Sequence, residues 1–199
     1  CLLALVRKLA PPSGAWLTAA STARVCSTGC VREEPSVAKN KLLKQGDVLP
    51  DVTLTGVDNQ PVRLKDLAGQ KVLVVYFYPR DDSPGCTVQA CGLRDQYEDF
   101  VAAGAEVVGI SGDSVASHQG FAAKHRLPFV LLSDEKGQAR EAFGVGTSFL
   151  GMLPGRVTFV VDREGTVQDS FESQIRVGEH VRRALELVRS LASKSAASP

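Results

Sequence analysis

The clearest pattern of apolar and polar positions lies in the middle of the chain. Residues 72–78 form an unbroken apolar run rich in β-branched and aromatic side chains, which is typical of a central strand buried on both faces. After a turn-rich loop, apolar side chains recur at roughly helical spacing until Gly104, at Val88, Cys91, Leu93, Tyr97, Phe100 and Val101. This spacing predicts one long amphipathic helix that begins near Pro84 and is capped by Asp82 or Ser83.

The rest of the domain alternates short strands with helices. Strands at residues 51–55 and 62–64, joined by a turn at 56–59, predict a hairpin. The elements expected next are strands at 107–110 and 129–132, helices at 115–125 and 138–143, a strand pair at 156–161 and 166–171 that turns at 162–165, and a closing helix at 179–191. Such alternation predicts βαβ units. The order indicates an α/β protein with a thioredoxin-like fold, a mixed central sheet flanked by helices with an added N-terminal β-hairpin.

Both ends of the chain differ from this central part. Residues 1–35 are rich in Ala, Ser and Thr and contain four basic residues, with no acidic residue before Glu33. This composition is typical of an organelle transit peptide, and a merely disordered terminus is the alternative. We therefore expect a leader at 1–35, one domain over residues 39–191 and a disordered small-residue tail over 192–199.

Charge and hydropathy exclude several classes of partner. The 23 basic residues nearly balance the 22 acidic ones, which leaves a net charge of +1. No large electrostatic field is therefore available for nucleic acid or an anionic membrane. No apolar run approaches the roughly 20 residues that cross a bilayer, so stable membrane insertion is not expected. A small neutral substrate suits this balance better.

The five cysteines are unevenly distributed. Cys1, Cys26 and Cys30 lie in the leader, whereas Cys86 and Cys91 lie in the domain. A disulfide-stapled extracellular scaffold would need more cysteines in a shorter chain, so the domain pair is expected to be redox-active or metal-binding. The three scattered histidines form no zinc spacing, and no glycine-rich loop has the spacing or setting of a dinucleotide site. No metal or cofactor is expected.

Cys86 occupies a position that suits a nucleophile. It follows Pro-Gly in the first turn of the expected helix, where unpartnered N–H groups and the helix dipole favour the thiolate. One reaction open to such a thiolate is attack on a peroxide. That reaction also requires stabilisation of the departing oxygen, which N–H groups at Gly85 and Cys86 can supply. The Ser83 hydroxyl can accept one hydrogen bond and donate another, toward sulfur and peroxide. Arg156, which opens a predicted strand, is the best candidate for a cation that contacts both.

Short motifs along the domain are similar, in content and order, to those of the Q-type peroxiredoxins, also called bacterioferritin comigratory proteins. The motifs around the cysteines are YFYP at 76–79, SPGC at 83–86, AC at 90–91 and RD at 94–95. The later motifs are GISGD at 109–113, LLSD at 131–134 and LPGR at 153–156. The resemblance covers about residues 39–191, nearly the whole chain outside the leader.

This resemblance implies a role for each candidate residue. Cys86 would be the peroxidatic cysteine, whose sulfenic acid forms an intramolecular disulfide with the resolving Cys91, while Arg156 and the hydroxyl at position 83 complete the site. The family usually has Thr where this chain has Ser83, which keeps the hydroxyl but loses the methyl that restricts its rotamer.

The resemblance also implies a reaction, partners and a location. The reaction would be the thiol-dependent reduction of hydrogen peroxide and organic hydroperoxides by a monomeric enzyme that thioredoxin regenerates. Plant members of the family are chloroplast proteins, stromal or thylakoid-associated, which agrees with the leader. A mitochondrial location is the alternative.

Simpler explanations exist for the same residues. Cys86 and Cys91 could be packed structural cysteines, and Arg156 could be a surface arginine at a strand edge. Asp81 and Asp82 are expected to act as cap and dipole partners of the helix, without a catalytic role. Two other functions stay open. One is a thioredoxin-like disulfide oxidoreductase, which normally has two residues between its cysteines instead of the four found here, and the other is a non-enzymatic redox sensor.

Overall fold

The apolar run in the middle of the chain forms the central strand of a sheet. In the computed structural model, which describes residues 41–148 and 153–196, β3 (Val72–Phe77) is buried at all of its positions. Leu73, Val75 and Phe77 face one core, and the alternate side chains of the strand face a second core. Successive side chains of a strand point to opposite faces of the sheet. Both faces of the sheet are therefore buried at β3.

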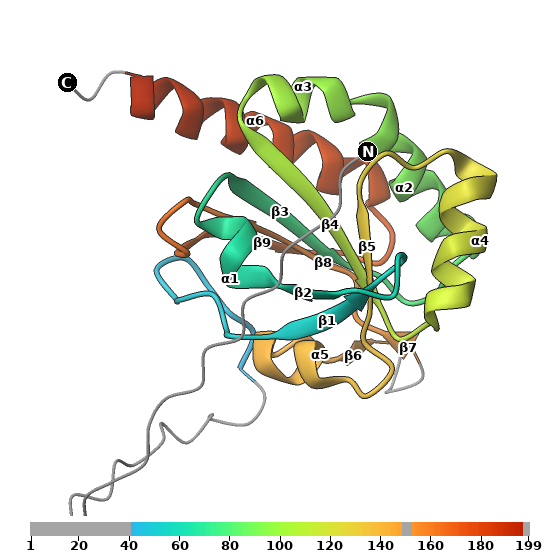
Figure 1. Ribbon diagram of the computed structural model, residues 1–199. Coiled ribbons are helices and arrows are strands. Elements are labelled where there is room, and N and C mark those ends of the chain that lie inside the picture. The colour runs from blue at the N-terminus through green and yellow to red at the C-terminus, as the bar shows by residue number, and fades with distance from the viewer. Residues whose placement is uncertain (1–40, 149–152, 197–199) are drawn as a thin grey trace, which may run out of the picture. The chain divides into compact units, whose positions relative to one another are not determined.

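Seven strands make up this sheet, in the order β2-β1-β5-β4-β3-β8-β9 (Figure 1). The other strands are β1 (Thr53–Gly56), β2 (Pro61–Arg63), β4 (Ala105–Ser111), β5 (Val130–Ser133), β8 (Val157–Val161) and β9 (Val167–Glu172). β3, β4 and β5 run parallel, whereas the β1–β2, β1–β5, β3–β8 and β8–β9 pairs are antiparallel. A separate two-stranded sheet pairs β6 (Thr147–Ser148) with β7 (Leu153–Pro154).

The helices divide between the two faces, as Figure 1 shows. One face carries α2 (Pro84–Asp95), α3 (Tyr97–Ala102), α4 (Val115–His125) and α6 (Val177–Ala196), and the other carries α1 (Leu64–Ala68) and α5 (Gln138–Phe143). The expected α/β architecture is confirmed, including the thioredoxin-like mixed sheet and the hairpin of β1 and β2 before it.

The predicted long helix after β3 is wrong. The chain leaves helical geometry at Gln96, where φ is −112° and ψ is 12°, so that α2 and α3 are separate helices. The apolar residues do not form one continuous buried stripe either, because Val88 is 62% exposed and Val101 is 45% exposed. Because of this break, α3 is a separate helix, and it buries Phe100 in the core on this face of the sheet.

Two predictions about the ends of helices also need correction. α6 continues to Ala196, so residues 192–196 are helical and not a disordered tail, because alanine, serine and lysine allow the helix to extend beyond its last buried turn. Residues 197–199 and the expected transit peptide at 1–35 lie outside the described residues.

Ser83 is the N-cap residue of α2, but neither its side chain nor that of Asp82 makes a capping hydrogen bond. Within the two described ranges, no helix is long and apolar enough to cross a membrane.

Gly109 allows the three parallel strands to pack closely. It lies between Tyr76 of β3 and Leu131 of β5 in the ladder, and a Cβ atom there would lie 2.7 Å from the Tyr76 hydroxyl and 2.6 Å from Leu131 Cδ2. We expect Gly109→Ala to lower the free energy of unfolding by about 1–3 kcal/mol through overpacking. Gly120→Ala on α4 is the matched control, because its Cβ would meet nothing within 4 Å; it should raise that energy by ~0.5–1 kcal/mol. Urea unfolding measures both, and equal effects would contradict the packing argument.

Candidate active site

Cys86 lies in the first turn of α2, directly beyond the carboxyl end of β3. Pro84 occupies the first turn, and the first hydrogen bond of the helix runs from Thr87 N–H to the Ser83 carbonyl over 2.9 Å. Helix geometry therefore leaves the N–H groups of Gly85 and Cys86 without acceptors inside the helix. The side chain of Cys86 is 1% exposed. The thiol is thus held in a largely dehydrated place next to the positive end of the helix dipole.

Arg156 reaches this thiol from the start of β8. Its Nη2 atom donates to Cys86 Sγ over 3.2 Å, and its Nη1 atom donates to Gln89 Oε1 over 2.5 Å. The arginine is 4% exposed, so its charge acts on the sulfur with little screening by water. Gly85 leaves the space for it, because a Cβ atom at that position would lie 3.1 Å from Arg156 Nη2. Arg156 thus contacts the thiol and is a buried residue, not a surface arginine at a strand edge.

A chain of hydrogen bonds that starts at His180 orients Arg156 through Thr158 and Gln89. His180 Nε2 lies 2.9 Å from the Ser173 carbonyl, and Nδ1 lies 2.8 Å from Thr158 Oγ1. Burial is the main reason that the pKa of His180 falls to about 4; the hydrogen bond to Ser173 opposes this effect, and the charges of Arg156 and Arg183 add to it. The neutral ring must therefore donate from Nε2 to the carbonyl and accept from Thr158. Thr158 in turn accepts from Gln89 Nε2 over 3.5 Å, which turns the Gln89 oxygen toward Arg156.

Sequence reasoning missed the members of this chain of hydrogen bonds. Gln89 carried a usable signal, because it lies three residues after Cys86 and so on the same side of the helix. Thr158 and His180 carried none, since the sheet and α6 bring them beside α2 only in the folded chain.

Ser83 and Cys91 lie apart from the contact between Cys86 and Arg156. The Ser83 hydroxyl donates to the Arg80 carbonyl over 3.1 Å, so its proton is directed into the loop and not toward sulfur. Cys91 is half-buried, and both domain cysteines are free thiols. Its Sγ atom lies 3.9 Å from His125 Nδ1. The structure thus brings Cys86, Gly85 and Arg156 together and places Cys91 on another side of α2.

Asp81 anchors the loop that carries Ser83, and it is not a helix cap as predicted. Its buried carboxylate accepts from Tyr78 Oη, Ser117 Oγ and His118 Nδ1 over 2.7–2.8 Å. Burial alone would raise the Asp81 pKa, but these hydrogen bonds outweigh it and hold the pKa below its usual value. His118 Nε2 lies 3.2 Å from the Leu132 carbonyl, so both ring nitrogens face acceptors. The buried contact between Asp81 and His118 ties the loop to α4.

Arg140 joins the two segments that meet at the site. Its guanidinium donates to the Tyr78 carbonyl, just after β3, and to the Gly155 carbonyl, next to Arg156. Burial lowers the pKa of Arg140, an effect that nearby Asp134 and Asp113 oppose. Tyr76, in the same buried cluster as Cys86, is a neutral phenol, because burial and then the negative charge assigned to Cys86 raise its pKa well above the usual value.

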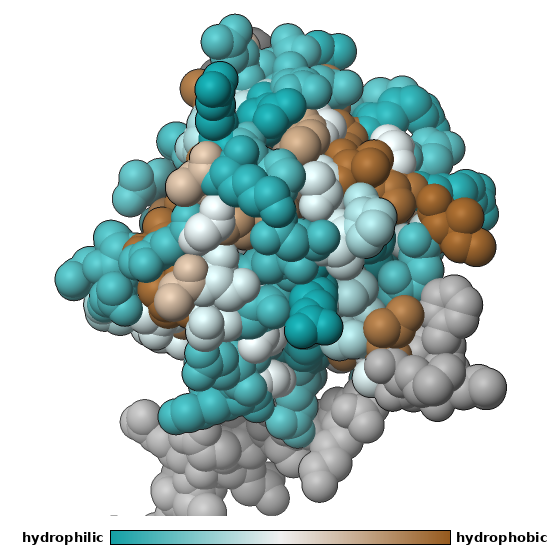
Figure 2. Space-filling model, turned by 90° about the vertical axis from the view of Figure 1, so that its right-hand side faces the viewer, coloured by the Kyte–Doolittle hydropathy of each residue, from teal (hydrophilic) through white to brown (hydrophobic). Residues whose placement is uncertain are grey.

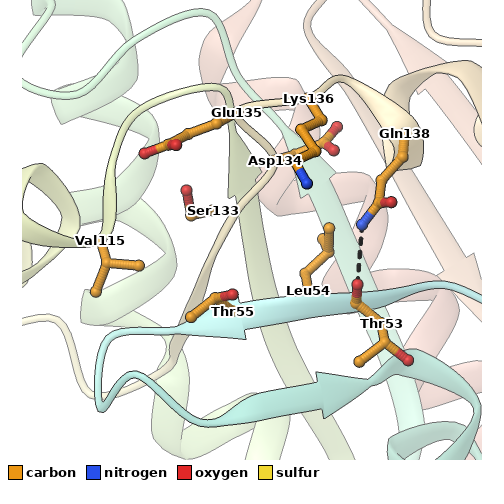
Figure 3. A pocket seen from close by; sticks show the side chains of 9 residues that line it. All are labelled: Thr53, Leu54, Thr55, Val115, Ser133, Asp134, Glu135, Lys136 and Gln138. Carbon is orange, nitrogen blue, oxygen red and sulfur yellow. Dashed lines mark hydrogen bonds between the residues drawn. The ribbon is translucent and has the colours of Figure 1, made fainter.

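A polar cavity elsewhere on the domain is not part of this site. It measures about 220 Å³ and is lined by β1, the end of β5 and the start of α5 (Figure 3). Gln138 donates across it to the Thr53 carbonyl, and the Asp134 carboxylate already accepts from the backbone of Ala139 and Arg140. It contains neither cysteine. Within residues 41–148 and 153–196, no group of three or more acidic, histidine or cysteine side chains is arranged to hold a metal ion.

Comparison with known proteins agrees with this geometry. The AhpC/TSA family profile matches residues 45–170. The chain is 50% identical over 147 residues to the chloroplastic peroxiredoxin Q of Sedum lineare, covering 74% of this chain and 78% of the relative.

Two solved structures are similar. The peroxidoxin BcpB of Mycobacterium tuberculosis has 36% identity and a TM-score of 0.70, covering 75% of this chain and 98% of that one. A structure of the Xanthomonas campestris bacterioferritin comigratory protein, described for its alkyl peroxide reduction activity, has 30% identity and a TM-score of 0.66, covering 73% and 99%. With Cys86 and Arg156 in contact at the head of α2 and this degree of similarity, the chain belongs to the AhpC/TSA family and, within it, to the Q-type peroxiredoxins.

Proposed function

We propose that Cys86 is the peroxidatic cysteine of this peroxidase and that Arg156 activates it. The observation that carries the proposal is the 3.2 Å contact from Arg156 Nη2 to Cys86 Sγ, made by a buried guanidinium. Arg156 Nε is a further buried donor that has no partner within the described residues. It is therefore free to hold a peroxide oxygen, as are the N–H groups of Gly85 and Cys86.

The first step follows from these groups. The Cys86 thiolate attacks one oxygen of the hydroperoxide, the O–O bond breaks, and the departing oxygen leaves as water or an alcohol once it takes a proton. Sulfur is oxidised to the sulfenic acid and the peroxide is reduced. Arg156 and the helix N–H groups stabilise the charge that develops on the departing oxygen. Ser83 joins them once its hydroxyl turns from the Arg80 carbonyl toward the peroxide.

Cys91 is the resolving cysteine in this proposal, and α2 must unwind for it to act. Two residues five positions apart on a helix have Cα atoms about 8.6 Å apart, whereas a disulfide tolerates at most about 7 Å. The helical turns between the two cysteines must therefore open before the disulfide can form. Cys86 is the more buried of the two sulfurs, so it must also become accessible to Cys91. Gly85 and Gly92 flank the segment and weaken it as a helix.

Substrate, donor and place complete the proposal. Members of the family reduce peroxides with thioredoxin-type donors, and we assign hydrogen peroxide, organic hydroperoxides and thioredoxin to this chain. Figure 2 shows exposed apolar side chains on the side of the molecule where α2 and α4 lie in Figure 1. Val88 of α2 is 62% exposed, and such apolar surface suits organic hydroperoxides. The relative from Sedum lineare is chloroplastic, in agreement with the composition of residues 1–35. Because both cysteines lie on one helix, the disulfide needs no second subunit, and we propose a monomer, which light scattering tests.

The two cysteines are distinguished by replacing each in turn. Cys86→Ser should abolish thioredoxin-dependent turnover, because a serine hydroxyl stays protonated where a thiolate forms. Cys91→Ser should consume about one equivalent of peroxide, accumulate the Cys86 sulfenic acid and then stall with thioredoxin. Steady-state assays and mass spectrometry after one dose of peroxide measure both. Substantial turnover by Cys86→Ser, or no oxygen adduct in Cys91→Ser, would reject the assignment.

Arg156 is tested with two variants of different charge and shape. Arg156→Ala should slow peroxide attack by a factor of order 10², the usual cost of losing one transition-state donor. Arg156→Lys keeps the charge but cannot contact Cys86 and Gln89 together, so a loss of intermediate size is expected. Rapid-reaction oxidation of the reduced protein gives the rate. An Arg156→Ala rate within a few-fold of the wild type would leave the arginine a structural role only.

Unwinding is tested by hydrogen exchange on the reduced and oxidised proteins. Protection of the amides from Thr87 to Gly92 should fall once the disulfide forms, whereas α3, a separate helix beyond the break at Gln96, should keep its protection. Equal protection of residues 87–92 in both states, with the Cys86–Cys91 disulfide verified by mass, would sink the idea.

A further inference from the structure

We propose that His125 is the base that ionises Cys91, and that Asp82 positions it. The proposal rests on the resolving role assigned to Cys91 above. His125 is the last residue of α4, and Asp82 lies in the loop before α2. The three side chains form a line: Cys91 Sγ lies 3.9 Å from His125 Nδ1, and His125 Nε2 lies 3.0 Å from Asp82 Oδ1.

The hydrogen-bond partners decide which nitrogen of His125 is free. A carboxylate only accepts hydrogen bonds, so Nε2 carries the proton and donates it to Asp82. In the neutral ring, Nδ1 then has a lone pair and faces the Cys91 sulfur. This is the tautomer that can take a proton from the thiol, and the resulting imidazolium would stay paired with Asp82.

Asp82 is held in place against its conformational preference. Its φ of 54° lies in the left-handed region, which few non-glycine residues adopt. Hydrogen bonds from Lys124 and then His125 lower its pKa, so the carboxylate is charged at neutral pH. The turn thus places a negative charge beside His125, and the Asp82 side chain makes no helix cap that would otherwise explain it.

The groups around the imidazole come from three segments. Arg94 of α2 donates from Nη1 to the His125 carbonyl over 2.8 Å, and its own charge is shared with Asp95. Asp95 and, more weakly, Cys91 raise the pKa of Arg94. Lys124, on the same helix as His125, binds Asp82, and its side chain is 61% exposed. The His125 side chain is only 17% exposed and packs on the Phe121 ring. Arg94 and Asp82 therefore favour a thiolate–imidazolium pair over the neutral pair.

The chemical step balances without another reactant. His125 Nδ1 takes the proton of Cys91, and the Cys91 thiolate attacks the sulfur of the Cys86 sulfenic acid as α2 unwinds. The S–S bond forms and the S–O bond breaks, and the departing hydroxide takes up the proton that His125 accepted from Cys91, so that water leaves and the imidazole is neutral again. The Cys91 sulfur is oxidised and the Cys86 sulfur is reduced to the disulfide level.

The size of the effect follows from thiol ionisation. An unassisted cysteine ionises near pH 8.5, so only about 3% is thiolate at pH 7. Assistance by His125 raises that fraction by roughly tenfold or more, but a more acidic thiol is also a weaker nucleophile, with a Brønsted coefficient of about 0.4–0.5. A net gain of about 3- to 10-fold in the rate of disulfide formation is expected near pH 7, and it should vanish above about pH 9, where the thiol ionises unaided.

The test separates the two chemical steps. Reduced full-length protein is mixed with one equivalent of hydrogen peroxide, quenched at successive times, and analysed by mass for Cys86 sulfenic acid and for the disulfide between pH 6 and 9.5. His125→Gln should form sulfenic acid at the wild-type rate. It should form the disulfide about 3- to 10-fold more slowly near pH 7 and at the wild-type rate above about pH 9. Asparagine tolerates the left-handed backbone, so Asp82→Asn should keep the turn and remove only the negative charge. It should show a smaller slowing than His125→Gln over the same pH range.

Lys124→Gln is the control for a general change of charge, and its rate of disulfide formation should stay within twofold. Unchanged disulfide formation in His125→Gln, or a slowing that is equal at every pH, would overturn the role of His125 as a base. A slowing in Lys124→Gln as large as that in Asp82→Asn would overturn the positioning role of Asp82. Failure of the wild-type protein to form either the Cys86 sulfenic acid or the Cys86–Cys91 disulfide is a different result, because it would reject the proposed function itself.

Discussion

The site depends on a guanidinium that is buried beneath a thiol. A charge removed from water is costly unless it is paired and hydrogen-bonded, and Arg156 meets this condition with Cys86 and Gln89. The arrangement works in both directions. The guanidinium donates a hydrogen bond to the sulfur, and the buried arginine is tolerated because it has this contact, Gln89 and a chain of hydrogen bonds that ends at His180. The rest of the domain keeps these groups in register, with Arg140 linking the end of β3 to the start of β8.

Under the proposed mechanism, the same interaction would stabilise α2 more in the reduced protein than in the oxidised one. A Cys86 thiolate would compensate the charge of Arg156 and hold the first turn of the helix against β8. A sulfenic acid or a disulfide carries no such charge, so this part of the stabilisation would be lost on oxidation. The helix also ends early, at Asp95, and α3 has its own buried anchor in Phe100. Local unwinding of α2 can therefore stop at the break and leave α3 packed on the sheet.

The histidines of the domain show how partners decide the state of one type of side chain. His180 lies between a carbonyl and a hydroxyl, so burial keeps it neutral and it orients its neighbours. His118 lies between a carboxylate and a carbonyl and serves as a buried structural anchor. His125 lies between a carboxylate and a thiol and is partly exposed to solvent. Of the three, the environment of His125 is the one that suits proton transfer.

Much of the fold and part of the site can be predicted from the sequence because their causes are local. The apolar run at 72–78, the alternation of strands and helices, and the place of Cys86 after Pro-Gly depend on neighbours in the chain. The similarity of the LPGR motif at 153–156 to that of the family also points to Arg156, although no local pattern places its guanidinium on the sulfur. The break at Gln96, the helical residues at 192–196, and the burial of Asp81 depend instead on what each segment packs against, which periodicity does not contain. Gln89, Thr158 and His180 come from α2, β8 and α6, and His125 and Asp82 from α4 and a loop. Only the tertiary structure brings these polar atoms within hydrogen-bonding distance, because such contacts depend on how separate elements cross and not on the order of residues within any of them.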